Sequence, residues 1–232
     1  MVFLVLGRGK MGRLIADVAL ERGHTARLMG GEENRNAAAL TSGALAGVDV
    51  VIDFTTPEAV IPNLRACLAA GSRVVVGTTG WYGKLEEMRA LCAGHNAGLV
   101  YGANFSVGVQ VMYRLTEVLG RLARGYSISI DETHHAGKKD APSGTAYAIK
   151  RIVELASADA AHPALKVEIT SHREGEAMGT HVVRARSADD LIEIKHEAFS
   201  RRGFAEGAVR AAEWLAGKTG FYEFSEVYPQ LG

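Results

Sequence analysis

The sequence has little cysteine, no excess charge and no long apolar run, and each shortage excludes a class of protein. Only two of its 232 residues are cysteines, and neither Cys67 nor Cys92 lies in a CxxC pair or beside a histidine. We therefore expect reduced, buried thiols in a cytoplasmic protein. Lysine plus arginine and aspartate plus glutamate both number 26, and no basic stripe is present, so we expect no nucleic acid partner.

No apolar run approaches the ~20 residues that are needed to cross a bilayer, so we expect no membrane partner. The apolar start Met1–Leu6 stops at Gly7 and has no charged lead, which argues against a signal peptide. Internal repeats, low-complexity tracts and proline-rich linkers are missing as well. The length allows one large domain or two modest ones.

Short apolar runs alternate with helical patterns in the first part of the chain. The runs are apolar throughout, as strands buried on both faces require. We predict strands at 2–6, 26–29, 49–54, 73–76 and 99–101, and helices after Gly12, at 57–71 and at 84–93. This alternation predicts an α/β fold, a Rossmann-type parallel sheet with helices on both faces.

The rhythm changes after Asn104, where predicted strands begin to follow one another. We predict helices at 107–123, 143–156 and 204–215, and strands at 126–133, 166–171, 180–185 and 191–198. Such an order is typical of an α+β domain, here with a mixed sheet. We therefore expect two domains, residues 1–105 plus 204–232 and residues 106–203.

A glycine-rich turn separates the first predicted strand from the first helix. In the pattern GxGxxG, Gly7 permits the tight turn, Gly9 lets a pyrophosphate approach, and Gly12 lets helix and strand pack closely. Arg8 and Lys10 place cations where phosphates would lie. A flexible turn without a ligand is the alternative, but the surrounding strand and helix favour a dinucleotide.

The second predicted strand ends at Met29 without the acidic residue that usually binds the ribose 2′-hydroxyl. Glu32 and Glu33 follow in the next loop, and either can take that role. Arg8 and Arg35 would tolerate a 2′-phosphate. We therefore expect NADPH to be accepted, without excluding NADH.

The stretch Asp131–Ala146 reads DETHHAGKKDAPSGTA and has no bulky apolar side chain, so core packing cannot explain it. Imidazole is the side chain suited to proton transfer near neutral pH, which makes His134 and His135 candidates for that role, and Lys138 can hold an anion. Ser143 is placed to cap the following helix, whose first amides can bind a carboxylate. A solvated charged loop is the alternative, but it leaves the paired histidines beside a helix start unexplained.

This stretch resembles the signature of the dihydrodipicolinate reductase family, in which an acidic residue, His-His and a lysine precede the run Asp-Ala-Pro-Ser-Gly-Thr-Ala. Residues 132–146 fill that pattern without a gap, and the resemblance extends to 51–58, 77–80, 103–108, 173–175, 179–181 and 204–210. It implies the reduction of (4-hydroxy-tetra)dihydrodipicolinate, a cyclic imine dicarboxylate, with NADPH or NADH in the diaminopimelate route to lysine.

The resemblance also implies roles for single residues. His134 matches the proton donor, and Lys138 matches a lysine of catalysis and substrate binding. The positions that match substrate binding are His135, Ser143, Gly144, Thr145 and Thr79. The positions that match cofactor binding are Gly7, Gly9, Lys10, Met11, Gly12, Phe54, Gly77, Thr79, Ala103 and Phe105. The first domain then binds the dinucleotide, and the second binds substrate and assembles a homotetramer.

Two other hypotheses stay open. Another nicotinamide-dependent enzyme of similar two-domain build, such as an amino-acid dehydrogenase, would use the glycine turn but would not need His134, His135 and Lys138. A nucleotide-sensing module would bind NADPH without using the stretch 131–146. The other histidines show no metal-ligand spacing, so we predict no metal, and for His181 a buried hydrogen bond. We expect Asp140 to hold the loop.

Overall fold

The computed structural model describes residues 1–158 and 162–231. Contacts divide it into two compact units, Met1–Val107 with Arg202–Gly232 (unit 1) and Gly108–Arg201 (unit 2). The boundaries predicted from the sequence were 105/106 and 203/204. None of the helices in the described part of the chain has the length and apolar character that crossing a bilayer requires.

Unit 1 contains a six-stranded sheet in which every neighbouring pair is parallel, with the strand order β10-β5-β4-β3-β1-β2. Its strands are β1 (Val2–Leu6), β2 (Thr25–Met29), β3 (Val50–Asp53), β4 (Arg73–Val76), β5 (Gly98–Tyr101) and β10 (Gly220–Glu223). The predicted parallel sheet is confirmed. The sequence reading missed β10, a four-residue strand after the last long helix.

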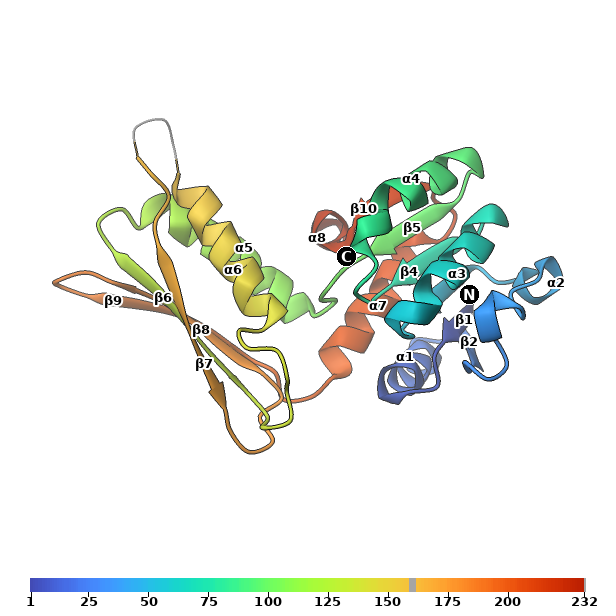
Figure 1. Cartoon of the computed structure of the whole chain (residues 1–232), viewed down its shortest axis with the longest axis horizontal. Coiled ribbons are helices and arrows are strands. Elements are labelled where there is room, and N and C mark those ends of the chain that lie inside the picture. Colours follow the sequence, from blue (N-terminus) through green and yellow to red (C-terminus); the bar gives the residue numbers. More distant parts are fainter. Residues whose placement is uncertain (159–161, 232) are drawn as a thin grey trace. The chain divides into compact units, whose positions relative to one another are not determined.

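Helices cover both faces of this sheet (Figure 1). One face carries α1 (Lys10–Glu21), α7 (Arg202–Leu215) and α8 (Phe224–Val227). The other carries α3 (Pro57–Ala69) and α4 (Leu85–Gly94). The connection from β2 to β3 holds only a 3-10 turn (Arg35–Ala37) and the short α2 (Ser42–Leu45). Two further 3-10 turns are Tyr82–Lys84 and Tyr228–Gln230.

The strand order reverses at β1, which lies between β2 and β3. Because all the strands are parallel, their carboxyl ends share one edge, and Leu6 lies level with both Met29 and Asp53. Ligands of open α/β sheets bind outside the carboxyl edge at such a reversal. The segments that follow β1, β3, β4 and β5 are therefore the place to look for a cofactor site.

Unit 2 contains a mixed sheet, as the sequence predicted, and its four strands lie in the order β7-β6-β8-β9. Its strands are β6 (Ser127–His134), β7 (Val167–Arg173), β8 (Thr180–Arg186) and β9 (Leu191–Glu197). The pair β6/β7 is parallel, and the pairs β6/β8 and β8/β9 are antiparallel. The helices α5 (Val107–Leu122) and α6 (Gly144–Ser157) cover one face of this sheet (Figure 1).

The alternation of side chains along β6 places two buried polar residues on the same face as the apolar core of unit 2. Ile128 and Ile130 face the helices and are buried. Because side chains alternate with a period of two, Glu132 and His134 face the same side, and both are buried as well. The face that packs the core therefore ends in a carboxylate and an imidazole beside the start of α6.

We predict that Gly207→Ala destabilises unit 1. Helix α7 lies so close to the segment after β5 that a Cβ at Gly207 would be 1.7 Å from the backbone oxygen of Phe105. Overpacking of this kind costs about 1–3 kcal/mol, which outweighs the ~1 kcal/mol that alanine gains over glycine inside a helix.

Thermal unfolding of purified protein checks this prediction, with Gly94→Ala as the control. Gly94 is the last residue of α4, and a Cβ there meets nothing within 4 Å. We expect a lower Tm for Gly207→Ala and an unchanged or higher Tm for Gly94→Ala. Equal Tm values for the two variants would contradict the close-approach argument.

Candidate active site

The turn between β1 and α1 has the geometry that a dinucleotide requires. Gly7 has φ +105°, and a Cβ there would lie 2.4 Å from the backbone oxygen of Phe54. A Cβ at Gly12 would lie 1.8 Å from the backbone oxygen of Gly7. By contrast, a Cβ at Gly9 would meet nothing within 4 Å. The first and third glycines are thus required by the fold, whereas the second leaves open space for a ligand.

Helix α1 starts at this turn with a positive end. Gly9 caps the helix through its backbone alone, and the first turn contains no acidic residue. Lys10 is exposed, and Met11 is partly buried against the core. Unsatisfied amides and the helix dipole at such an end favour a phosphate. The turn and the start of α1 therefore fit the pyrophosphate of a dinucleotide.

Aromatic side chains lie at the same edge of the sheet in the segments that follow β3 and β5. The ring of Phe54 lies against Gly77, since a Cβ at Gly77 would be 2.2 Å from that ring. The ring centroids of Phe54 and Phe105 are 5.9 Å apart, and those of Phe105 and Phe224 are 4.5 Å apart. The rings of Phe105 and Phe224 are buried, whereas that of Phe54 is partly exposed and can pack against a nicotinamide ring. Two other predicted cofactor positions, Thr79 and Ala103, are exposed beside them.

A buried carboxylate holds these loops together. Asp53, at the end of β3, is fully buried, and its Oδ1 accepts hydrogen bonds from the amide and hydroxyl of Thr55 at 3.0 and 2.7 Å. The Thr78 hydroxyl, after β4, donates to the same oxygen at 3.0 Å. The Asn63 amide donates to Oδ2 at 2.8 Å, and Asn34 donates in turn to Asn63. Burial raises the pKa of Asp53, and these hydrogen bonds oppose the rise.

Glu33, rather than Glu32, folds back to the end of β2. Its Oε2 accepts a hydrogen bond from the amide of Gly30 at 2.9 Å, and its Oε1 pairs with Arg8 at 2.8 Å. The hydrogen bond from the Gly30 amide and the pairing with Arg8 lower the pKa of Glu33. A carboxylate therefore does stand where the ribose 2′-hydroxyl of a dinucleotide is normally bound, although the sequence left this open.

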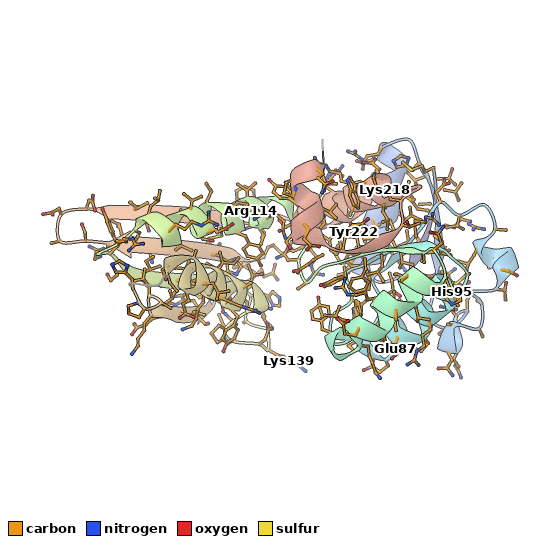
Figure 2. The ribbon with its side chains drawn as sticks, turned by 90° about the horizontal axis from the view of Figure 1, so that it is seen from above. Glu87, His95, Arg114, Lys139, Lys218 and Tyr222 are labelled. Carbon is orange, nitrogen blue, oxygen red and sulfur yellow. The ribbon has the colours of Figure 1, made fainter. Side chains whose placement is uncertain are left out.

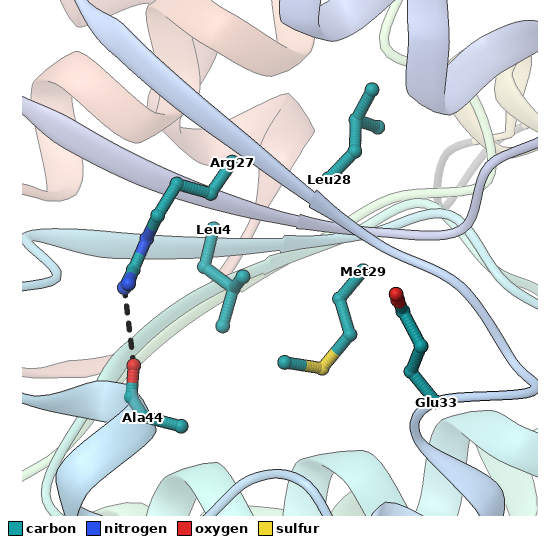
Figure 3. A pocket seen from close by; sticks show the side chains of 6 residues that line it. All are labelled: Leu4, Arg27, Leu28, Met29, Glu33 and Ala44. Atoms are coloured by element: carbon teal, nitrogen blue, oxygen red, sulfur yellow. Dashed lines mark hydrogen bonds between the residues drawn. The ribbon is translucent and has the colours of Figure 1, made fainter.

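A cavity of about 370 Å³ lies next to Glu33 on the edge strand β2 (Figure 3). It is lined by Leu4, Arg27, Leu28, Met29, Glu33 and Ala44. The Arg27 guanidinium lies along one side of it and donates to the backbone oxygen of Ala44 in α2 at 3.1 Å (Figure 3). The β2–β3 connection contains only short helical segments, so no long helix covers this side of the strand.

In unit 2, polar side chains converge at the end of the sheet. Glu132 Oε1 accepts hydrogen bonds from Arg173 Nη2 at 2.9 Å and from the Ser143 amide at 3.2 Å. Glu132 Oε2 lies 2.7 Å from His134 Nδ1. The ring of His134 makes an edge contact with that of His181, with centroids 5.1 Å apart. Three strands and the start of α6 supply this group.

The protonation states follow from burial and charge. Burial raises the pKa of Glu132, but the neighbouring Ser171 hydroxyl and the hydrogen bonds from Arg173 and Ser143 hold it at about 2, so the carboxylate is ionised. Burial lowers the pKa of His134, and the charge of Glu132 opposes this. Burial and the neighbouring His134 lower the pKa of His181 to about 4, so His181 is neutral near pH 7.

Ser143 caps α6, as the sequence predicted. Its side chain accepts a hydrogen bond from the Ala146 amide at 3.2 Å, and the same oxygen lies 3.1 Å from His181 Nε2. The buried hydrogen bond that we predicted for His181 is therefore confirmed. The first turn of α6, which includes Gly144 and Thr145, contains no acidic residue and so remains suited to an anion.

The loop between His134 and Ser143 carries two lysines, and they lie in different surroundings. Lys138 Nζ pairs with both oxygens of Asp140, at 2.7 and 2.9 Å. Arg173 also donates to the backbone oxygen of Asp140. Lys139 is exposed, and Figure 2 labels it at the edge of unit 2. His135 is half-buried at the start of the loop. Asp140 thus holds the loop, as expected, and also holds Lys138.

One group of possible metal ligands lies among the described residues. Ligand atoms of Glu132, His134 and His181 are within 4.8 Å of one another. Both oxygens of Glu132 already face donors, and the guanidinium of Arg173 lies at the same carboxylate. A second cation there would be repelled, so we interpret the group as a proton-transfer and anion site.

The structure brings the predicted residues together in two groups. The cofactor positions and Thr79 lie at the carboxyl edge of unit 1, and His134, Ser143, Gly144 and Thr145 meet at the end of the unit 2 sheet. Sequence reasoning assigned no role to Glu132 and Arg173, and it did not place His181 beside His134. The period-two pattern of β6 could have found Glu132, but the others depend on strand pairing.

Comparison with known proteins covers nearly the whole chain. A family model described as "Dihydrodipicolinate reductase, N-terminus" matches residues 1–105, and one described as "Dihydrodipicolinate reductase, C-terminus" matches residues 108–228. The 4-hydroxy-tetrahydrodipicolinate reductase of Christiangramia forsetii is 37% identical over 98% of this chain and 97% of its own. That of Anaeromyxobacter dehalogenans is 40% identical over 79% of this chain and 74% of its own.

Solved structures agree on the fold. A dipicolinate-bound dihydrodipicolinate reductase from Paenisporosarcina sp. TG-14 matches with a TM-score of 0.77 and 23% identity, over 98% of this chain and 99% of its own. An amine dehydrogenase from Mycobacterium smegmatis matches with a TM-score of 0.68 and 10% identity, over 100% of this chain and 97% of its own. The two family models and the relatives that are 37% and 40% identical show that the chain belongs to the dihydrodipicolinate reductase family.

Proposed function

We propose that this chain reduces 4-hydroxy-tetrahydrodipicolinate to tetrahydrodipicolinate with NADPH or NADH, a step of the diaminopimelate route to lysine. The observation that carries the proposal is the buried group of Glu132, His134 and Ser143 beside the start of α6, in a chain of this family. It offers a proton donor next to a place for a carboxylate. An amino-acid dehydrogenase or a nucleotide sensor would need no such group.

The chemistry assigns distinct tasks to the residues of unit 2. When bound, the reduced nicotinamide supplies a hydride to a ring carbon of the substrate. Loss of the 4-hydroxyl as water gives the conjugated C=C–C=N system, and hydride addition to that system leaves negative charge on it. The imidazole of His134 delivers the proton that quenches this charge, a contribution typically of ~10²–10⁴-fold in rate.

The substrate's two carboxylates require cations and amides. Lys138 supplies an ammonium, and the start of α6 at Ser143, Gly144 and Thr145 supplies a positive helix end. His135 lies at the start of the same loop, and Thr79 follows β4 in unit 1. Since Lys138 is held by Asp140, a carboxylate of the substrate competes with Asp140 for its ammonium.

In unit 1, the first turn of α1 would hold the pyrophosphate at Gly9, Lys10 and Met11. Phe54, Gly77, Ala103 and Phe105 would hold the nicotinamide end. Unit 2 is also our proposed assembly unit, with a homotetramer as the expected state. The buried, free thiols of Cys67 and Cys92 fit a cytoplasmic setting, which we propose as well.

We predict that His134→Gln lowers kcat by ~10²–10⁴-fold while cofactor binding stays close to normal, because glutamine cannot donate a proton as imidazolium does. Oxidation of NADPH and NADH with enzymatically made substrate measures kcat, and cofactor fluorescence measures binding. His172→Gln is the control, because His172 lies on β7 and faces Asp131 instead. A near-normal kcat in His134→Gln would remove this residue from the mechanism.

We predict that pyridine-2,6-dicarboxylate, a planar dicarboxylate like the substrate, competes with substrate and binds roughly tenfold more weakly to Lys138→Ala, since a charge-assisted hydrogen bond is lost. Lys139→Ala serves as the matched control, because this neighbouring lysine is exposed. Calorimetric titration of both variants gives the comparison. If the compound does not compete at millimolar concentration, the dicarboxylate substrate is the wrong class.

We predict that Glu33→Gln shifts cofactor preference towards NADPH by about two- to fivefold in the ratio of kcat/KM values, as expected for an exposed charge pair. The change removes a negative charge next to the proposed 2′-phosphate position and frees Arg8. Steady-state kinetics with both cofactors measures the ratio, and Glu32→Gln is the control. An unchanged ratio in Glu33→Gln would place the ribose elsewhere.

A further inference from the structure

The contact between Glu132 and His134 joins two otherwise unsatisfied buried atoms. Glu132 Oε2 and His134 Nδ1 have no other hydrogen-bond partner among the residues that the structure describes, and they lie 2.7 Å apart. The side chain of Glu132 is fully buried, and that of His134 is 10% exposed. Two buried polar atoms at this distance need a proton between them.

That proton belongs to the imidazole, because the carboxylate is ionised. In the neutral ring, Nδ1 therefore carries the hydrogen and points to Glu132, and Nε2 is left to exchange a proton. Gly179, the residue before β8, has no side chain that could cover Nε2. A Cβ at this position would lie 3.1 Å from Nε2, and the residue has φ +146°. The ring is thus held on one side and open on the other.

Glu132 also fixes the ring relative to the start of α6. Its other oxygen, Oε1, accepts the Ser143 amide at 3.2 Å and Arg173 Nη2 at 2.9 Å. One carboxylate therefore contacts the proton donor with one oxygen and the anion-binding helix start with the other. The proposed reaction needs the imidazole and the start of α6 at a fixed separation. The imidazole must deliver a proton to the substrate ring while a carboxylate of the substrate is bound at the start of α6.

We propose that Glu132 is a positioning residue: it holds His134 with Nε2 towards the substrate and ties this ring to the carboxylate-binding start of α6. The proposal rests on the proposed function for its substrate, but the Glu132–His134 contact can be tested without turnover. Glu132 itself touches neither substrate nor cofactor in this role.

The charges that face His134 predict what the loss of Glu132 does. Lys138 from the loop and Arg173 from β7 both disfavour the imidazolium, whereas Glu132 favours it. His181 from β8 lies against the ring and is neutral near pH 7, and His196 of β9 is paired with His181 in the sheet. Removing the charge of Glu132 therefore leaves two cations and lowers the pKa of His134 further.

The test compares Glu132→Gln with the wild type over a range of pH. Because the reaction uses protonated His134, kcat/KM falls as the pH rises through its pKa. In Glu132→Gln this fall moves to lower pH, and each unit of movement lowers kcat/KM about tenfold at pH values above both pKa values. The same variant regains rate on the acid side, which His134→Gln does not. Glu132→Asp keeps the negative charge, so we expect the midpoint of its pH profile to lie between those of Glu132→Gln and the wild type.

Asp131→Asn is the matched control, because Asp131 is the adjacent carboxylate on β6 but pairs with Arg184 and His172 on the opposite face. Its pH profile should follow that of the wild type. A Glu132→Gln profile with the wild-type midpoint and the wild-type rate would overturn the proposal. A uniform loss at every pH, with no movement of the midpoint, would also overturn it and would indicate a structural role.

A measurement on the wild type keeps the proposal testable even if Glu132→Gln does not fold. Nitrogen chemical shifts of His134, assigned by comparison with His134→Gln, report which ring nitrogen carries the hydrogen. We expect the Nδ1–H form above the pKa, and a predominant Nε2–H form would refute the contact with Glu132. This readout does not depend on turnover, so a protein with the expected shifts and no reductase activity would refute the proposed function alone.

Discussion

A buried carboxylate must find hydrogen-bond donors, and this requirement organises both units of the chain. Asp53 at the end of β3 collects Thr55, Thr78 and Asn63. Glu132 near the end of β6 collects Ser143, Arg173 and His134. An isolated charge in such a place would be strongly unfavourable, so the loops that carry the donors are held in position. In each unit the donors come from different segments, and these are the segments that form the candidate site.

The two carboxylates solve this problem differently. Asp53 is satisfied by neutral hydroxyl and amide groups, and burial raises its pKa. Glu132 has a guanidinium and an imidazole beside it, and its pKa is held at about 2. The first arrangement suits a rigid scaffold under a bound cofactor. The second keeps a fixed negative charge next to the imidazole of His134, which we propose as the proton donor.

The sequence predicts the parts of this structure that depend on local pattern. Apolar runs between glycines give β1 to β5, alternation gives β6, and the Ser143 cap follows from residue type and spacing. Local pattern cannot reveal features that depend on register between strands. The contact of His181 with His134 needs the antiparallel pairing of β8 with β6, and the contact of Arg173 needs the parallel pairing of β7. Strand β10 was missed because four residues carry too little pattern. The choice between Glu32 and Glu33 stayed open because it depends on how their loop folds back to Gly30.

The period-two pattern of β6 also limits how this segment can change length during evolution. Ile128, Ile130, Glu132 and His134 share one face, while Asp131 shares the other with Arg184. Deleting or inserting one residue between Ile130 and Glu132 would turn the carboxylate and the imidazole outward and bring Asp131 or Thr133 under the helices. A change of two residues would keep the face but move His134 past the start of α6. Length variants of this protein should therefore occur in the β2–β3 connection, which carries no such register, and not in this strand.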